Sequence, residues 1–425
     1  MVDDVGHWWL LRQQSIIASS FEGTADMGLR GDAAVVGFAE HKHERKYTGP
    51  RKFTLEQWAE LAKLALDDAG LAAHDVNGIV CSDIREAGMF TPATIVEYLG
   101  HPVNFAERID LGGATAVGMI WRAAAAIELG ICDVVLCAAP ARPIPSNPNA
   151  RPIDPRRYFG ASSVEWGSPQ AEFDIPYGNV AQNCGYAMIA QRYAAEFGYD
   201  PRAMAKLVSH QRANGAANPN AVFFGQPASI EDVLASKLIA DPLRMLEIVM
   251  PVAGGSAVVV AGREVARRCR HRAAWVTGFG EHLTIKTPTY AQDMVHTPVG
   301  PASRQAFAMA GVKPTDVHAA EIYDCYTITV LLTLEDAGFC AKGEGMEFIN
   351  DHDFTVKGDF PMNTHGGQLG VGQAGLAGGM TQPIEAVRQI MHRAGDSQLG
   401  QCDIVYVSGT GGVMSEQAAL ILQGD

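Results

Sequence analysis

Two stretches of this chain carry the same short pattern. Residues 37–41 read Gly-Phe-Ala-Glu-His, and residues 278–282 read Gly-Phe-Gly-Glu-His. The Ala-Gly pair at 69–70 recurs at 310–311 with the same offset. Matches that keep both their order and their spacing predict an internal duplication, so we expect two similar halves.

Two further matches follow at longer offsets. A Gly-Gly pair at 112–113 has a match at 366–367, and Cys-Asp-Val-Val at 132–135 has a match in Cys-Asp-Ile-Val at 402–405. The offset grows along the chain, as insertions in the second copy would make it grow. The duplication is therefore expected to span most of the chain.

Each half alternates apolar strands with amphipathic helices. In the first half, the apolar run 33–38 precedes a segment, 55–69, with apolar residues at helical spacing, and a second apolar run follows at 78–81. This alternation is typical of a layered α/β architecture. Residues 142–250 interrupt the first half, and an insertion of this length usually forms a cap over a functional site.

These patterns predict the domain organisation. We expect an N-terminal extension over 1–32, a first half over 33–270 that includes the cap 142–250, and a second half over 271–425.

Composition excludes several classes of protein. The chain has 33 Lys and Arg against 47 Asp and Glu, a net charge of −14. Nucleic-acid binding needs a basic face, so we expect no nucleic-acid partner. The eight cysteines form no Cys-x-x-Cys pair, so we expect no metal site. The acidic start and the lack of a long apolar stretch predict a cytoplasmic protein with free thiols and no membrane segment.

Four blocks carry a resemblance to a known family. They are Asp-Leu-Gly-Gly-Ala-Thr at 110–115, Tyr-Asp-Cys-Tyr at 323–326, a segment at 363–373 that begins Asn-Thr-His-Gly-Gly and ends Gly-Gln, and Ser-Gly-Thr-Gly-Gly at 408–412. Over about residues 33–425 the chain resembles the thiolase superfamily, in particular the sterol-carrier-protein-type thiolases and the lipid-transfer-protein-type aldolases of bacterial steroid side-chain breakdown. The resemblance implies a five-layer α-β-α-β-α fold of two duplicated halves with an inserted cap.

The chain departs from a thiolase at the catalytic positions. Gly113 stands where the nucleophilic cysteine belongs, Gln373 replaces the activating histidine, and Ser408 replaces the second cysteine. Without a nucleophile and a base, thiolysis has no evident route. The related aldolases also carry glycine at the first position and tyrosine where Tyr323 stands, although they have a second tyrosine near Gln373. The resemblance therefore implies retro-aldol cleavage of a β-hydroxyacyl-CoA to a ketone or aldehyde plus acetyl- or propionyl-CoA.

The candidate catalytic residues follow from the same blocks. Tyr323 and Asp324 come directly after an apolar strand, where sites gather in α/β folds. The Tyr323 phenol could accept or return the β-hydroxyl proton, with Asp324 orienting it or acting as a base. His365 could donate to the thioester carbonyl or serve as an acid or base. Each of these side chains could instead be a core residue with satisfied hydrogen bonds, and we expect Cys325 to serve mainly in packing.

The candidate binding residues are mostly glycines. Gly112 and Gly113 precede a predicted helix whose first amides could hold a thioester oxygen. The amides of Gly411 and Gly412 could stabilise an enolate oxygen in the same way. Two residues of the 363–373 segment complete the set, since Gln373 can donate a hydrogen bond and Asn363 opens the segment.

Two alternatives remain open at this point. The chain could be an acyltransferase of the thiolase type with Cys325 as a non-standard nucleophile, or a non-catalytic acyl-CoA or lipid-binding subunit. The resemblance implies coenzyme A as part of the substrate, with no separate bound cofactor. It also implies a homodimer and a small partner with a zinc ribbon and an OB fold, together forming a heterotetramer.

Overall fold

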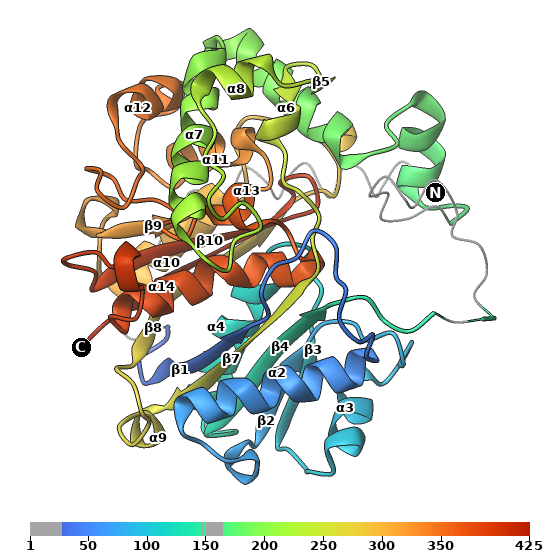
Figure 1. Ribbon diagram of the computed structural model, residues 1–425, viewed down its shortest axis with the longest axis vertical. Coiled ribbons are helices and arrows are strands. Elements are labelled where there is room, and N and C mark those ends of the chain that lie inside the picture. Colours follow the sequence, from blue (N-terminus) through green and yellow to red (C-terminus); the bar gives the residue numbers. More distant parts are fainter. Residues whose placement is uncertain (1–27, 147, 150–164) are drawn as a thin grey trace, which may run out of the picture.

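The structure is a computed structural model that describes residues 28–146, 148–149 and 165–425. The expected extension over 1–32 lies outside these residues, apart from its last five. Within the described part, one mixed sheet of nine strands runs in the order β3-β2-β4-β7-β1-β8-β11-β10-β9 (Figure 1). The strands are β1 (Ala33–Glu40), β2 (Gly78–Cys81), β3 (Phe105–Arg108), β4 (Val134–Ala141), β7 (Gly254–Gly262), β8 (Ala274–Leu283), β9 (Ala319–Glu321), β10 (Ile404–Gly411) and β11 (Glu416–Gln423).

Helices cover this sheet, and a small hairpin lies apart from it. The helices are α2 (Thr54–Ala69), α3 (Thr91–Leu99), α4 (Thr115–Glu128), α6 (Gln182–Phe197), α7 (Pro201–Ala217), α8 (Ile230–Ala235), α9 (Arg263–Ala266), α10 (Val299–Ala310), α11 (Thr327–Asp336), α12 (Gly345–Asp351), α13 (Gly367–Val371) and α14 (Thr381–Ile390). The hairpin pairs β5 (Leu238–Ala240) with β6 (Leu243–Arg244). Across the described residues, no helix combines the length and the apolar character that crossing a membrane requires.

The sheet shows the duplication directly. Outward from β1 come β7, β4 and β2, and outward from β8 come β11, β10 and β9. The pairing repeats too, because β1–β7 and β8–β11 are antiparallel while β2–β4 and β9–β10 are parallel. β1 meets β8 at the centre through Ala34 with Trp275 and Val35 with Ala274. The predicted duplication of the halves is confirmed.

The structure corrects one of the sequence matches, the pairing of Gly112–Gly113 with residues 366–367. α4 and α14 hold corresponding places in the fold, because both pack in the core between the two parts of the sheet. α4 begins after Gly112–Gly113 and α14 begins after Gly378–Gly379, each at a threonine two residues later. The structural counterpart of Gly112–Gly113 is therefore Gly378–Gly379 and not 366–367. A dipeptide match could not distinguish the two pairs.

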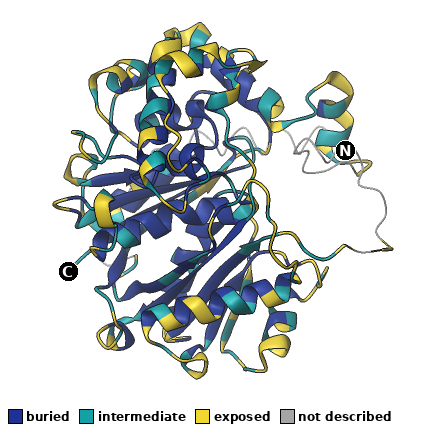
Figure 2. Ribbon diagram, viewed as in Figure 1, coloured by how far each residue is buried: buried dark blue, intermediate teal, exposed yellow. Residues whose placement is uncertain are grey.

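Alternate residues of β1 face two different cores. Ala33 and Val35 belong to the inner core with α4 and α14, whereas Ala34 and Val36 belong to the outer core under α2. In the second half, the outer sheet face packs on α10 and α11. The layers are therefore α2, sheet, α4 with α14, sheet, and α10 with α11, which confirms the five-layer α-β-α-β-α arrangement. Strands such as β1, β4, β7, β10 and β11 are buried along most of their length, as Figure 2 shows in dark blue, and they are largely apolar.

The segment between β4 and β7 packs on the other half of the molecule. Its helices α6 and α7 share a core with α11 of the second half, built from residues such as Tyr193, Leu207 and Leu331. Figure 1 shows these helices above β9 and β10. The insertion therefore belongs to the first half in sequence but covers the second half in space. Its exact boundaries stay a prediction.

Candidate active site

Tyr323 lies just past the carboxyl end of β9, beside the parallel strand β10. β9 ends at Glu321, and its partner β10 runs beside it in the same direction. The Tyr323 backbone N–H donates to the Ser408 hydroxyl of β10 at 3.1 Å, which fixes the tyrosine at this edge. Its side chain is only 2% exposed. The carboxyl edge of parallel strands is the common place for sites in α/β folds, as the sequence predicted for this residue.

The phenol of Tyr323 covers Gly113. A Cβ atom built on Gly113 would overlap the Tyr323 hydroxyl and the Thr410 carbonyl oxygen. Gly112 has a φ of +53°, and a Cβ there would lie 2.9 Å from the Gly411 Cα. Only glycine allows this close approach of backbones. The space beside Gly113 is therefore filled by a tyrosine phenol from the other half.

Gln373 holds the phenol from the side. Its Nε2 donates a hydrogen bond of 2.9 Å to the Tyr323 hydroxyl oxygen. Burial raises the pKa of Tyr323 well above its ordinary value, while this hydrogen bond works in the opposite direction. Gln373 cannot accept a proton as the thiolase histidine does, but it can stabilise a phenolate.

Asp324 holds a helix in place. Its carboxylate accepts the backbone N–H groups of Gln368 at 2.7 Å and Leu369 at 3.1 Å, and the Gln382 amide at 3.0 Å. The first two bonds fix the first turn of α13, and the third comes from α14. Burial raises the pKa of Asp324 to about 7. The arrangement favours the predicted orienting role over the role of a base, because both carboxylate oxygens are already engaged.

Cys325 points away from Gly113 into a packed region. Its thiol donates to the Tyr186 hydroxyl at 3.4 Å and lies 3.6 Å from the Thr329 hydroxyl. Burial raises the pKa of Cys325 to about 12. The thiolate is the nucleophilic form, so this cysteine is poorly suited to attack a thioester.

The side chain of Asn363 forms two hydrogen bonds with the backbone of Ile322, the residue that follows β9. The amide oxygen accepts the Ile322 N–H at 2.7 Å, and the amide nitrogen donates to the Ile322 carbonyl at 2.8 Å. The residue has a φ of +49°, which asparagine tolerates better than most residues. Asn363 thus ties the 363–367 loop to the strand that carries Tyr323.

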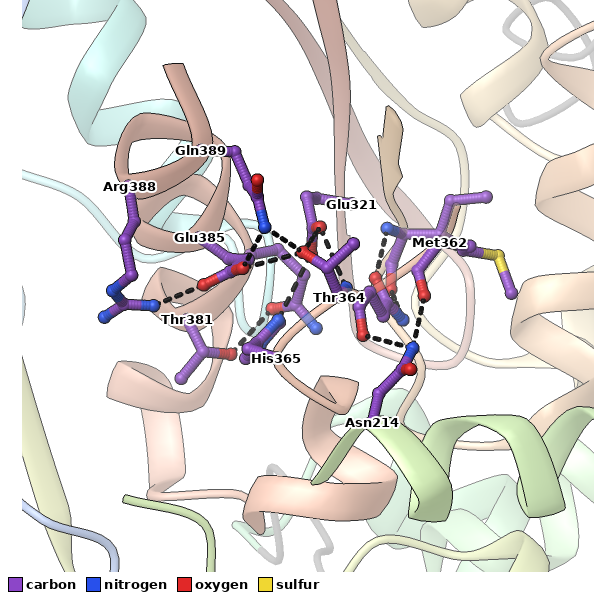
Figure 3. Close-up of polar contacts among 12 residues, drawn as sticks. Asn214, Glu321, Met362, Thr364, His365, Thr381, Glu385, Arg388 and Gln389 are labelled. Carbon is purple, nitrogen blue, oxygen red and sulfur yellow. Dashed lines mark hydrogen bonds and ion pairs between the residues drawn. The ribbon is translucent and has the colours of Figure 1, made fainter. Parts of the chain in front are cut away.

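His365 belongs to a buried cluster of charged residues beside this loop (Figure 3). Its Nδ1 lies 3.3 Å from Glu321 Oε2, while Arg388 of α14 pairs with Glu385 and with Glu40 of β1. Burial opposes a charge on the imidazole, but the close contact with Glu321 and the nearby carboxylates outweigh it and raise the pKa of His365. The ion pair of His365 thus runs to Glu321 and not to Tyr323.

Comparison with known proteins identifies the family of this chain. Residues 280–424 match the family described as thiolase C-terminal domain-like. A steroid side-chain-cleaving aldolase of Thermomonospora curvata is 32% identical, over 93% of this chain and 99% of the relative. The 17-hydroxy-3-oxo-4-pregnene-20-carboxyl-CoA lyase of Mycobacterium tuberculosis is also 32% identical, over 90% and 97%. The chain belongs to the thiolase superfamily. Within this superfamily, both relatives are named as carbon–carbon lyases, which places the chain among the lyases of thiolase fold.

A solved structure gives the same result in three dimensions. The Ltp2-ChsH2(DUF35) aldolase superposes with a TM-score of 0.79 at 30% identity, covering 94% of this chain and 99% of that one. The fold of this thiolase-superfamily lyase thus extends over nearly the whole chain.

A partly open cavity of about 350 Å³ adjoins the glycines of this lyase. It borders Gly112 and Gly412, and its wall includes Asp110, Lys286 and Glu416. Pockets for small ligands have volumes of about 300–1,000 Å³. The cavity thus borders the residue that precedes Gly113, the glycine beneath Tyr323.

Of the residues predicted from sequence, the structure brings one subset together. Gly112, Gly113, Tyr323, Gln373 and the Gly411–Gly412 pair meet at one point, with Asp324 directly behind. The contacts of Asn363 and His365 lead elsewhere, to Ile322 and Glu321.

Sequence reasoning missed two residues at this point. A Cβ on Gly379 would overlap the Gly113 carbonyl oxygen and lie 3.4 Å from the Tyr323 ring, and Thr410 lies against Gly113 from the other side. The Gly-Gly-x-Thr pattern shared by 112–115 and 378–381 was a signal that could have revealed Gly379.

Proposed function

We propose that this lyase cleaves the carbon–carbon bond of a β-hydroxyacyl-CoA, releasing a ketone or aldehyde and acetyl- or propionyl-CoA. The observation that carries the proposal is the Tyr323 phenol lying over Gly113, where a thiolase has its nucleophile. A buried phenol held by Gln373 can transfer a proton, whereas glycine cannot form an acyl-enzyme. The names of the two relatives at 32% identity support a steroid side chain as the acyl group.

In the proposed reaction, Tyr323 acts as its phenolate, whose oxygen accepts the β-hydroxyl proton and becomes the neutral phenol. The Cα–Cβ bond then breaks, the β-carbon becomes a carbonyl, and the electron pair moves into the thioester as an enolate. The amides of Gly411 and Gly412 would stabilise the enolate oxygen, and His365 is a further proposed donor. The proton returns from Tyr323 to Cα. The step is redox-neutral and balanced in protons, so we propose no bound cofactor beyond the coenzyme A of the substrate.

Acyl transfer is the second candidate function, and Cys325 would have to be its nucleophile. The raised pKa of this thiol, which burial causes, and its bond to Tyr186 disfavour that function. A non-catalytic acyl-CoA or lipid-binding role is distinguished by turnover, which only the lyase would show.

We propose two protein partners. The solved neighbour is a complex of an aldolase chain with a DUF35 chain, which supports a partner of that kind, the small zinc-ribbon and OB-fold protein expected above. A second copy of this chain is the other, forming a homodimer. β3 is an edge strand of the sheet, and Met89, Phe90 and Tyr98 around α3 are large apolar residues exposed beside it. Unpaired edges with apolar neighbours are sites where chains associate.

We also propose a cytoplasmic location. All eight cysteines are free thiols, as expected in a reducing compartment.

The experiment is turnover of a defined substrate. The purified chain, alone and with a DUF35 partner, is incubated with the CoA ester named for the M. tuberculosis relative. We expect a ketone and a shorter acyl-CoA in equal amounts, and an intact mass unchanged after incubation with acetyl-CoA. A stable acyl adduct on Cys325 would contradict the proposal and support acyl transfer. Binding of the CoA ester without turnover, even with the partner present, would support the non-catalytic role.

A further inference from the structure

Two buried glutamines beside the site have no hydrogen-bond partners for their side chains. Gln211 of α7 and Gln368 of α13 are both fully buried, and neither the amide oxygen nor the amide nitrogen of either residue is bonded to a described residue. A buried amide without partners is costly, so such a group needs an explanation. The two side chains differ in what they face.

Gln368 faces the catalytic phenol together with Gln373. A Cβ built on Gly378 would lie 2.8 Å from the Gln373 Cγ and 3.1 Å from the Gln368 Oε1, so the two side chains border the same point. Gln368 lies close enough to lower the pKa of Tyr323, which burial raises, although it makes no hydrogen bond of good geometry there. Gln211 instead borders Gly367 and Asp324.

The backbone of Gln368 is fixed by the residue next to the phenol. Its N–H donates to Asp324 at 2.7 Å, and Gln368 follows the first residue of α13, Gly367. A Cβ on Gly367 would overlap the Asp324 carboxylate, so the helix start can only approach this closely as glycine. The Tyr323–Asp324 pair therefore sets the position from which the Gln368 side chain reaches the phenol.

We propose that Gln368 is a positioning residue whose amide N–H, together with that of Gln373, holds the Tyr323 oxygen and stabilises its anion during proton transfer. The inference rests on the proposed function, in which that oxygen alternates between phenol and phenolate. It also explains the unpaired amide, because the group is reserved for the charged form. The torsion at the end of a glutamine side chain is broad, so a small rotation brings the N–H onto the oxygen.

The surroundings of the phenol make such a donor necessary. The ionisable groups with the largest effect on it are the Cys325 thiol and the Asp324 carboxyl, and neither can carry a positive charge. Burial and these neighbours all disfavour a phenolate. Amide donors are therefore the groups here that favour the anion.

The test compares Gln368→Met with Gln211→Met, two changes that remove an equally buried, unpartnered amide. Replacing an unpaired polar group by an apolar one of similar shape costs little stability, so both variants are expected to fold. A fluorinated tyrosine is placed at position 323, and its ionisation is followed by fluorine NMR. We expect Gln368→Met to raise the apparent pKa by about one unit, since a hydrogen bond to a charged group has that strength, and Gln211→Met to leave it unmoved.

The rising limb of the pH–kcat/KM profile should shift upward by the same amount in Gln368→Met alone. Equal shifts in both variants, or no shift in either, would overturn the assignment of Gln368. The NMR titration needs no turnover, so a failure of the proposed lyase activity would leave it readable. Absence of activity in the unmodified enzyme would thus count against the proposed function and not against Gln368.

Discussion

The two halves share one fold, but one contributes backbone to the site and the other contributes side chains. The first half contributes backbone, since Gly112 and Gly113 form a surface without side chains at the start of α4. The second half contributes the polar side chains, with Tyr323 after β9 and Gln373 after α13. In the second half the corresponding helix start also carries a glycine, Gly379, which packs on Gly113. The duplicated fold thus brings the starts of two helices together. The polar side chains at this contact, Tyr323 and Gln373, both come from the second half.

Under the proposed function, this difference between the halves accounts for a lyase without thiolysis. Both the phenol of Tyr323 and its amide donor Gln373 come from the second half. The glycine is then required, because the phenol fills the volume over position 113. The predictions below test this division, beginning with the change expected to have the greatest effect.

Gly113→Cys should reduce lyase turnover by about 1,000-fold or more without creating thiolysis. The new side chain would overlap the Tyr323 hydroxyl and the Thr410 carbonyl oxygen, so the phenol is displaced. Proton transfer by a positioned group contributes about 10²–10⁴-fold, and misplacement forfeits it. The measurement is the turnover of the β-hydroxyacyl-CoA and of acetoacetyl-CoA. Gly88→Ala is the control, because a Cβ at Gly88 meets nothing. Robust thiolysis by Gly113→Cys would show that the phenol does not exclude the cysteine.

His365→Leu should lower the free energy of unfolding by about 3 kcal/mol, as breaking a buried ion pair does. The change leaves Glu321 buried with its partner removed. Denaturant titration measures the loss, and adding Glu321→Gln should recover part of it. A loss below about 1 kcal/mol would mean that the pair is not formed in solution. Turnover by the folded variant tests the donor role separately, with a fall of about 10-fold or more supporting it.

Asp324→Asn should change the pH dependence of stability. The folded-state pKa of Asp324 is raised to about 7 by burial, above its ordinary value of 3.8. Between those two pH values the folded protein binds a proton that the unfolded chain has released, so stability falls as pH rises through this window. We therefore expect the difference in Tm between the wild type and Asp324→Asn to become smaller as the pH rises from 5 to 8. A difference that grows with pH would show that the carboxylate form is the stabilising one.

Cys325→Ala should have the smallest effect, with turnover reduced less than about threefold. The thiol has a pKa raised to about 12 by burial, and its hydrogen bonds serve packing against Tyr186. Steady-state kinetics measures the change. A loss of a hundredfold or more, together with loss of an acyl adduct, would identify Cys325 as a nucleophile after all.

The fold could be predicted from the sequence because the two halves share short matching sequence patterns. Residues 37–41 and 278–282 lie at the ends of β1 and β8, the two strands at the centre of the sheet. The departures at Gly113 and Gln373 were visible as well, because each falls inside a motif. These features are local, so a single chain displays them.

The relation between Gly113 and Tyr323 could not be predicted in the same way. The two residues are far apart in sequence and meet only because both helix starts converge at the junction of the halves. For the same reason, the double change Gly113→Cys with Gln373→His would supply a nucleophile and a base but would still meet the Tyr323 phenol over position 113. The partner of His365 was also hidden, because Glu321 reads as part of an apolar strand end and its pairing depends on burial.

The central claim is that the phenol of Tyr323 carries the proton in a reaction without an acyl-enzyme. The direct measurement is the turnover and substrate affinity of Tyr323→Phe, which keeps the ring over Gly113 and removes only the hydroxyl. We predict a kcat lowered by about 100-fold or more, with binding of the CoA ester nearly unchanged, because acid–base catalysis supplies that factor and the phenol contributes little to binding. Full activity in Tyr323→Phe would contradict the account.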